Sequence, residues 1–305
     1  MRRLVVLLAL LAALAAVAAG CGSDEGESQG TPAPPESTAA SETGTAEEAC
    51  AKENLQTKEP GTLTIGTDNP GFPPWFQDAE GAPWDPTTEP TKMGYEAAVA
   101  YAVAEELGFG DDEVTWTVVP FAQSFRPGPK DFDFDINQIS YSDKRAEAVD
   151  FTSSYFDVNQ AVVALKSSKI ANATSIADLK DAKLGAPVGT TSYDYIVNNV
   201  QPNEQPGVYD TLNDAISALK AKQIDGIVVD YPGAFYMTAV QIPNSKIVGQ
   251  FPTVGSQEYF GLVLEKSSPL TPCVDGAVET LRENGRLEQL QQEWLQGESS
   301  PPVLE

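Results

Sequence analysis

Strand patterns alternate with helical patterns in two successive runs, and this alternation limits the fold more than any other feature of the chain. Residues 61–69 (GTLTIGTDN) and 113–121 (EVTWTVVPF) read as strands. An Ala-rich helix is expected between them over residues 95–107, with Gly108 as its C-cap. A second run begins at Ala161. Alternation of this kind predicts an α/β fold with mostly parallel sheets, and two runs predict two lobes.

Composition excludes several classes of function. The chain has 305 residues and a formal net charge of −25, so it should repel nucleic-acid phosphates and anionic membranes. It contains no histidine, which excludes Ser-His-Asp and Cys-His catalysis and histidine metal sites. The three cysteines include no CxxC pair, and no Gly-rich phosphate loop follows a strand. We therefore expect no metal, no cofactor and no nucleic-acid partner.

The N-terminus has the pattern of a secretion signal. Two arginines precede an apolar run that ends in small residues before Cys21, which predicts a signal peptide over residues 1–20. The ending Ala18-Ala19-Gly20-Cys21 resembles the lipobox of bacterial lipoproteins. This resemblance implies that Cys21 is diacylated and anchors the protein on the extracytoplasmic side of the cell membrane. An ordinary signal peptide with a chance cysteine is the alternative.

Residues 21–49 are predicted to be the lipidated N-terminus followed by a disordered acidic linker. Positions 22–49 hold seven acidic residues, no basic residue and no aromatic residue, so they cannot bury enough apolar surface to fold. Lipidation of Cys21 would leave Cys50 and Cys273. In an oxidising compartment such a pair predicts one disulfide, with two separate buried thiols as the alternative.

The order of several motifs indicates a family. The motifs are the GYE helix start at Gly94, followed by ISYSDKRAEAVDF, GTTSYDY, DGIVVDY, EYFGLVLEK and ENGRLEQLQQEWL. Over roughly residues 61–296 the chain resembles the extracellular solute-binding proteins of family 3, the receptors of polar amino-acid ABC transporters. The resemblance implies a periplasmic-binding-protein-like fold of type II. In that fold a ligand cleft lies between two α/β lobes joined by two crossover strands.

The same resemblance implies a division of the chain and a set of partners. Residues 50–157 would form the first part of lobe 1, residues 158–251 lobe 2, and residues 252–297 the return to lobe 1. Residues 298–305 would be a tail. The partners would be a small amino acid and the permease subunits of an ABC transporter. The protein would act as a monomer that closes about its hinge.

Five residues of the first lobe correspond to ligand contacts of the family. Arg145 would clamp the ligand α-carboxylate, since its planar guanidinium matches carboxylate geometry. Ser140 would contact the backbone groups of the amino acid, and Asp68 its side chain or amino group. Phe72 and Phe121 would sandwich the ligand. The alternatives are a solvated turn charge for Arg145, a turn role for Asp68, and loop or core packing for the two aromatic residues.

Three residues of the second lobe complete this predicted site. Thr190 and Thr191 open a helix, where hydroxyl and amide groups would bind the other side of the carboxylate. Asp230 would pair with the α-ammonium. The alternatives are helix-capping roles for the threonines and for Asp230.

The chain also departs from the family pattern. A second acid is missing after Glu96, and residues 126–132 (RPGPKDF) stand where a regular helix is usual. Two other kinds of protein share the fold: a secreted cyclohexadienyl (arogenate or prephenate) dehydratase-like enzyme and the sensor lobes of signalling proteins. Without histidine, such an enzyme would need a cleft carboxylate such as Asp68 as its acid or base. A surface adhesin is a further alternative, and it would not need Arg145 and Asp230 to converge.

Overall fold

The computed structural model describes residues 46–295 and 302–305. Residues 44–305 form one compact unit, whereas the predicted signal peptide, Cys21 and most of the predicted linker lie outside the described residues. Helix α1 (Ala46–Ala49) takes up the last four residues of the segment predicted as linker. Ordered structure therefore begins before Cys50. In the described ranges no helix is both long and apolar enough to span a bilayer.

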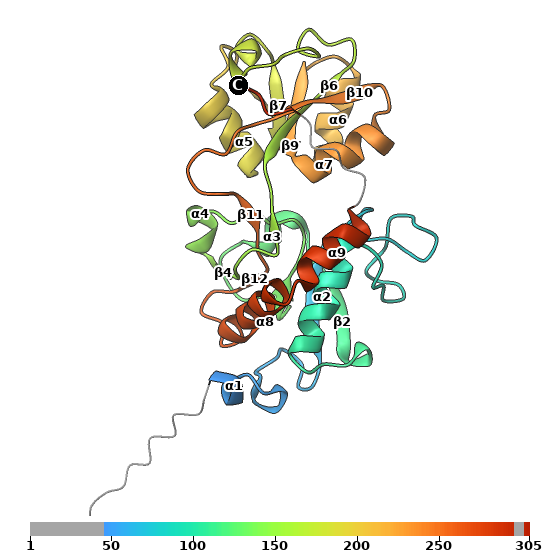
Figure 1. Ribbon diagram of the computed structural model, residues 1–305, viewed down its shortest axis with the longest axis vertical. Coiled ribbons are helices and arrows are strands. Elements are labelled where there is room, and N and C mark those ends of the chain that lie inside the picture. The colour runs from blue at the N-terminus through green and yellow to red at the C-terminus, as the bar shows by residue number, and fades with distance from the viewer. Residues whose placement is uncertain (1–45, 296–301) are drawn as a thin grey trace, which may run out of the picture. The chain divides into compact units, whose positions relative to one another are not determined.

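Strands and helices alternate along the chain in both lobes (Figure 1). The strands are β1 (Leu63–Thr67), β2 (Val114–Val118), β3 (Phe134–Asp135), β4 (Val149–Phe151), β5 (Phe156–Asp157), β6 (Gln160–Leu165), β7 (Leu184–Pro187), β8 (Gly207–Tyr209), β9 (Gly226–Asp230), β10 (Ser245–Gln250), β11 (Tyr259–Phe260) and β12 (Val263–Glu265). The longer helices are α2 (Tyr95–Glu106), α6 (Leu212–Lys220), α8 (Thr271–Glu283) and α9 (Arg286–Trp294). The short helices are α3 (Phe121–Ser124), α4 (Asp143–Ala146), α5 (Thr191–Tyr195) and α7 (Tyr231–Tyr236), with single turns at Lys52–Asn54, Asp111–Glu113, Ile176–Leu179, Ile196–Val200 and Met237–Gln241.

Lobe 1 is built on a five-stranded sheet of order β2-β1-β3-β12-β4. Helices α2, α8 and α9 pack against one another on this lobe (Figure 1). The predicted Ala-rich helix is confirmed as α2, whose small side chains are buried nearly all round. It ends where Gly108 takes a φ of +82°, a left-handed conformation that favours glycine. The first predicted strand forms β1, and the second is shorter than expected because Pro120 ends it.

Lobe 2 is built on a five-stranded sheet of order β10-β6-β9-β7-β8. Strand β6 is buried on both faces, as expected for a central strand covered by helices on each side. Val163 faces the cluster that contains residues of α6 and α7. Val162, its neighbour in sequence, faces a second cluster that contains Ile196 and Phe251. The lobe therefore has a core of its own, separate from that of lobe 1.

Two crossings made by paired strands join the lobes, and the chain reaches lobe 2 again between α9 and residues 302–305. The chain leaves lobe 1 through β5 and returns through β11, and these two strands pair antiparallel with Phe156 opposite Phe260. The prediction of mostly parallel sheets holds only in part, because two of the four pairings in each sheet are antiparallel. The antiparallel pairings involve β6 and β12, the strands that directly follow the crossings. These strands therefore run opposite to the neighbours that follow helices.

The predicted disulfide is present between Cys50 and Cys273. Cys50 lies between α1 and the turn at Lys52–Asn54, and Cys273 lies in the first turn of α8, so the bond ties the start of the lobe 1 chain to a C-terminal helix.

The last residues of the chain do not form a free tail. Val303 pairs in parallel with Gln250 at the end of β10, and the Leu304 amide donates to the Gln250 carbonyl at 2.8 Å. The Leu304 side chain is 1% exposed and belongs to the lobe 2 core. A side chain at Gly249 would collide with Leu304, so this close approach requires glycine. Residues 302–305 thus pair with the edge of the lobe 2 sheet, within the segment that was expected to be a tail.

Candidate functional site

Arg145 lies in α4, the short helix that follows the loop after β3. The Ser142 hydroxyl caps this helix by accepting from the Arg145 amide at 3.2 Å. The loop before it is held against the returning crossing, because Ser140 forms a bridge with Phe260 and the Tyr141 amide donates to the Tyr259 carbonyl. Local capping and pairing with β11 therefore direct the arginine inward, and its side chain is 7% exposed. A solvated turn charge does not describe it.

The guanidinium of Arg145 contacts both lobes. Nη1 donates to the Ser140 carbonyl at 2.7 Å, and Nη2 donates to the Gly189 carbonyl of lobe 2 at 3.0 Å. The group lies over two aromatic rings, 4.2 Å from the Phe125 centroid and 5.6 Å from that of Phe121. Burial lowers the pKa of Arg145 to about 10, and this lowering is opposed by the charges of Glu258 and Asp194. Arg145 thus stays cationic at neutral pH.

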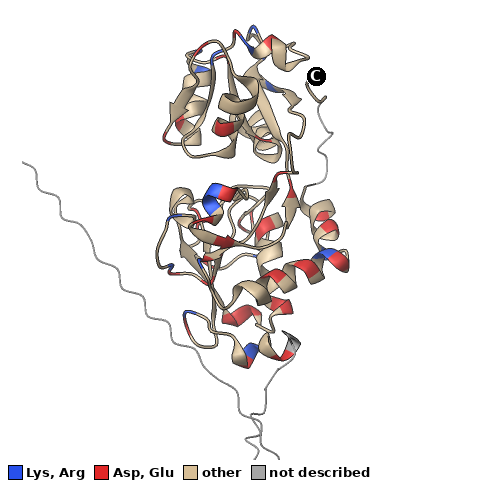
Figure 2. Ribbon diagram, turned by 90° about the vertical axis from the view of Figure 1, so that its left-hand side faces the viewer, with Lys and Arg blue, Asp and Glu red and all other residues tan. Residues whose placement is uncertain are grey.

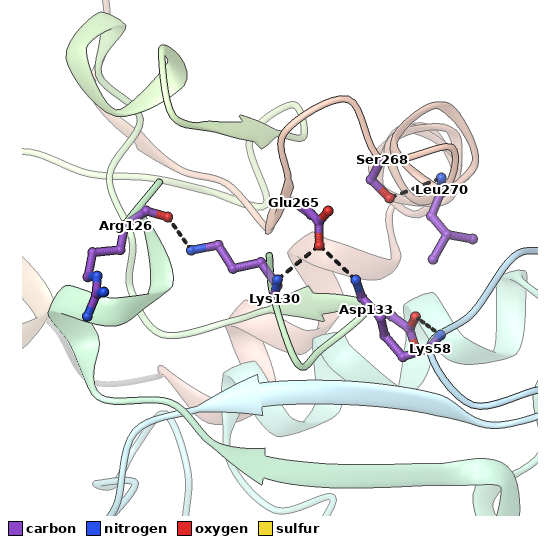
Figure 3. A network of polar contacts seen from close by, with 7 residues as sticks. All are labelled: Lys58, Arg126, Lys130, Asp133, Glu265, Ser268 and Leu270. Carbon is purple, nitrogen blue, oxygen red and sulfur yellow. Dashed lines mark hydrogen bonds and ion pairs between the residues drawn. The ribbon is translucent and has the colours of Figure 1, made fainter. Parts of the chain in front are cut away.

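A polar network holds the segment that carries Phe125. Figure 3 shows the Lys58, Lys130, Asp133 and Glu265 side chains around residues 126–133. Glu265 Oε2 accepts from Lys58 Nζ at 2.8 Å and from the Lys130 amide at 2.9 Å. Lys130 Nζ in turn donates to the carbonyls of Gln123 and Arg126 at the end of α3. Residues 126–132, which depart from the family pattern, thus hold in place the Phe125 ring that contacts the Arg145 guanidinium.

In lobe 2, the turn between β7 and α5 faces the arginine. Gly189 takes a φ of +72°, so its left-handed conformation favours glycine at the residue that accepts from Arg145. The Thr190 hydroxyl accepts from the Tyr193 amide at 3.2 Å and donates to the Pro187 carbonyl at 2.8 Å, which makes it the N-cap of α5. The Thr191 hydroxyl instead faces lobe 1 and lies 3.4 Å from the Ser140 hydroxyl.

Asp230 ends β9 and caps α7. Its Oδ1 accepts from the Gly233 amide at 2.8 Å, so the capping alternative for this residue is observed. The pKa of Asp230 is raised to about 6. Burial is the main cause and the charge of Glu258 adds to it, while the hydrogen bond from Gly233 acts in the opposite direction. As a whole residue, Asp230 is half-buried. Capping of α7 and contact with a cation are therefore compatible.

Glu258 connects these groups, although it was not among the predicted site residues. It lies just before β11 on the returning crossing, and its carboxylate accepts from the Thr191 hydroxyl at 2.6 Å. It also accepts from Gln160 Nε2 at 2.9 and 3.0 Å. Gln160, 3% exposed, pairs with Asp230 across β6 and β9 and accepts from the Ser192 hydroxyl through Oε1.

We call Ser140, Arg145, Gly189, Thr191, Gln160, Glu258 and Asp230 the site network. It runs from the cation of lobe 1 to the acid of lobe 2 through Ser140, Thr191, Glu258 and Gln160 in turn. Within the described ranges Arg145 and Asp230 are linked through these residues and not by a direct hydrogen bond or ion pair, while the charge of Glu258 acts on both.

The remaining predicted residues lie around this network in different ways. Asp68 follows β1, and its Oδ1 accepts from the Asn69 amide, a local turn contact. Phe72 is 36% exposed, and its ring centroid lies 6.0 Å from that of Tyr236 in lobe 2. Phe121 lies in α3 and not in a strand, and it packs edge-on against Phe125. In this structure the Phe121 ring contacts the guanidinium of Arg145.

Two buried acids lie in lobe 1 behind the site network. Burial raises the pKa of Glu96 to about 7, while its bonds from the Tyr155 hydroxyl and from Gln138 lower it. Burial also raises the pKa of Asp135 well above its usual range, and neither of its carboxylate oxygens accepts a hydrogen bond from the described residues. Glu96 holds the Gln138 amide at 2.6 Å and thereby positions the loop that leads to Ser140.

Two cavities of the described structure lie elsewhere. One of about 410 Å³ is lined by residues of α2 and α9 that include Tyr101 and Trp294. The other, of about 250 Å³, lies beside the crossings and is lined by residues that include Asn159 and Gln250. Neither is lined by a member of the site network, so the polar contacts identify the site. No group of three or more acidic or cysteine side chains in the described ranges is arranged to hold a metal ion.

Comparison with known proteins gives three informative similarities. The L-cystine-binding protein TcyJ of Escherichia coli strain K12 is 25% identical over 242 residues, which cover 78% of this chain and 84% of that protein. The structure of an ancestral arginine-binding protein bound to glutamine has a TM-score of 0.61 and 26% identity, covering 79% of this chain and 100% of that chain. The structure of the ancestral amino acid-binding protein AncCDT-1, a precursor of cyclohexadienyl dehydratase, has a TM-score of 0.59 and 24% identity over 77% of this chain and 95% of that one.

These structures confirm the expected two-lobe α/β fold. The match to a family model extends over residues 63–297, nearly the whole folded part and almost the range that the motifs indicated. The chain belongs to the bacterial extracellular solute-binding proteins, family 3.

Proposed function

We propose that this protein is the extracytoplasmic receptor of an ABC importer and that it binds an amino acid between its lobes. The observation that carries the proposal is the site network. It presents a buried guanidinium from lobe 1 and a carboxylate from lobe 2 to the same crossing region. A zwitterion needs one cation and one anion, and these two groups supply them.

The site residues take separate roles in this proposal. Arg145 binds the α-carboxylate, with Ser140 and the Thr191 hydroxyl beside it. Asp230 binds the α-ammonium. The Thr190 hydroxyl serves as a helix cap, so its contribution comes through the shape of the turn. Phe72 and Tyr236 approach each other from the two lobes, which suits aromatic contacts that form as the lobes close.

The mechanism is a population shift. A ligand that contacts Arg145 and Asp230 at once interacts with the closed state more strongly than with the open state, and only such a difference moves the equilibrium. The two crossings, near 157/158 and 251/252, divide the lobes in this proposal. The permease would recognise the closed form.

The proposal includes the attachment of the receptor to the membrane. We propose that residues 1–20 are removed and that Cys21 carries the acyl chains, such as palmitate. Metabolic labelling with a palmitate analogue should tag the wild type and not the Cys21→Ser variant. Labelling of both variants alike would remove this part of the proposal. The monomeric state would be checked by light scattering with and without ligand.

A thermal-shift panel of the amino acids, followed by calorimetry on the hits, tests the central proposal. At least one amino acid should raise Tm and bind with a stoichiometry of one per chain. The Asp230→Asn variant should lose affinity for that amino acid but not for its analogue without the ammonium group. Equal losses for both compounds would remove Asp230 from the role.

The same samples test the enzyme alternative. We propose that the protein is a receptor and not an enzyme, so incubation with prephenate or arogenate should leave the absorbance of the substrate unchanged. Formation of an aromatic product at a rate that depends on protein concentration would contradict the proposal.

A further inference from the structure

The carboxylate of Glu258 accepts the hydrogen bond of the Thr191 hydroxyl, which the proposed ligand would also need. Thr191 Oγ1 donates to Glu258 Oε1 at 2.6 Å, and a hydroxyl has one proton to donate. A ligand α-carboxylate beside Arg145 would therefore share Thr191 with a second carboxylate. In the described part of the chain the Glu258 carboxylate also accepts from Gln160 Nε2, which is neutral.

The site network carries more negative than positive charge. Its cation is Arg145, and its anions are Glu258 and Asp230. A zwitterion brings one charge of each sign, so it pairs with Arg145 and Asp230 and leaves the charge of Glu258 without a counter-ion. A half-buried carboxylate without a counter-ion is costly, and a ligand of opposite charge removes that cost.

The surroundings strengthen this excess. The charge of Asp194 also acts on Arg145, so another acid lies near the cation of the network. Acidic positions recur along the ribbon of lobe 1, the lower lobe in Figure 2, where lysine and arginine positions are fewer. The whole chain has a formal net charge of −25. Both the local and the overall field therefore attract cations and repel anions.

We propose that Glu258 sets the charge class of the ligand by favouring amino acids with an additional cationic group and rejecting acidic amino acids. This inference rests on the proposed function. Attraction would come from the charge of Glu258 acting on a ligand ammonium or guanidinium. Rejection would come from a second ligand carboxylate that meets Glu258 instead of a donor.

Calorimetry with L-arginine, L-glutamine and L-glutamate tests this inference on the wild type and on Glu258→Gln. The wild type should bind arginine more tightly than glutamine, and glutamate least. Glu258→Gln keeps the size of the side chain and removes one charge, so the affinity ratio of arginine to glutamate should fall at least about tenfold. Glu258→Asp retains the charge and should retain most of the ratio. Glu279→Gln, on the exposed face of α8, removes the same charge elsewhere and should leave the ratio unchanged.

The outcomes separate this inference from the proposed function. Glutamate binding as tight as arginine binding, or an unchanged ratio in Glu258→Gln, would overturn the role of Glu258 and leave the receptor proposal standing. If no amino acid of any charge binds the wild type, both proposals fall together. A salt titration of the wild type gives a second measurement, since arginine affinity should decline with ionic strength more steeply than glutamine affinity.

Discussion

Arg145 and Gly189 join the two lobes through a hydrogen bond of 3.0 Å from the guanidinium Nη2 to the carbonyl oxygen. The donor belongs to α4 on lobe 1, and the acceptor belongs to the turn before α5 on lobe 2. The same guanidinium lies over the Phe125 ring, 4.2 Å from its centroid, so it contacts an aromatic ring of lobe 1 while it donates to lobe 2. A flexible ammonium cannot satisfy both constraints.

The first prediction concerns this geometry. Arg145→Lys keeps the charge but loses the planar fork, so amino-acid binding should weaken by about 1.5–3 kcal/mol, measured by calorimetry. Lys144→Ala is a matched control, because Lys144 is the exposed neighbour of Arg145 and its removal should leave affinity unchanged. Wild-type affinity in Arg145→Lys would show that the guanidinium does not bind the ligand.

The second prediction is a dependence of binding on pH. The pKa of Asp230 is raised to about 6 by burial and by Glu258. Above that pH the carboxylate is ionised and can pair with an ammonium, and below it the proton removes the charge. Affinity for the amino acid should therefore rise between pH 5 and 7 and then level off, as followed by calorimetry in matched buffers. In Asp230→Asn the rise should be largely absent, and an undiminished rise would assign the effect to another group.

The third prediction concerns Glu96, the acid of the GYE motif. Glu96→Ala leaves the Tyr155 hydroxyl and the Gln138 amide without their shared acceptor, so the free energy of unfolding should fall by about 1–3 kcal/mol. Urea denaturation measures this change. Glu105→Ala alters an exposed position of the same helix and should have little effect. Equal effects of the two substitutions would mean that the buried contacts of Glu96 contribute nothing.

The fourth prediction concerns the last residues of the chain. Leu304→Ala removes a fully buried side chain from the lobe 2 core, so the free energy of unfolding should fall by about 2–5 kcal/mol. Val303 is 56% exposed, which makes Val303→Ala a control from the adjacent position. If urea denaturation gave the same midpoint for Leu304→Ala as for the wild type, residues 302–305 would not stabilise lobe 2.

Local patterns predicted the parts of the site that depend on nearby residues. The Gly-Thr-Thr turn opens α5 as expected. The Ala-rich pattern and Gly108 located α2 almost to the residue. These features depend on contacts between residues that are close in the sequence, and such contacts leave a recognisable spacing.

The rest of the site depends on contacts between distant segments. Glu258 meets Gln160 across 98 residues and Thr191 across 67, so no local spacing marks it. Phe125 lies beneath Arg145 because a network of Lys130 and Glu265 fixes its segment. The hydroxyl of Thr190 was predicted to bind ligand, yet the first turn of α5 has amides that the hydroxyl satisfies.

The bond between Cys50 and Cys273 determines how the protein would bear mechanical tension. A pull on the chain from upstream of Cys50 passes through two sulfur atoms into α8 and so reaches lobe 1 near its C-terminal helices. The load would therefore not pass through the residues between Cys50 and β1, which would otherwise detach from lobe 1 first. Neither cysteine lies in lobe 2, so the disulfide does not link such a pull directly to that lobe.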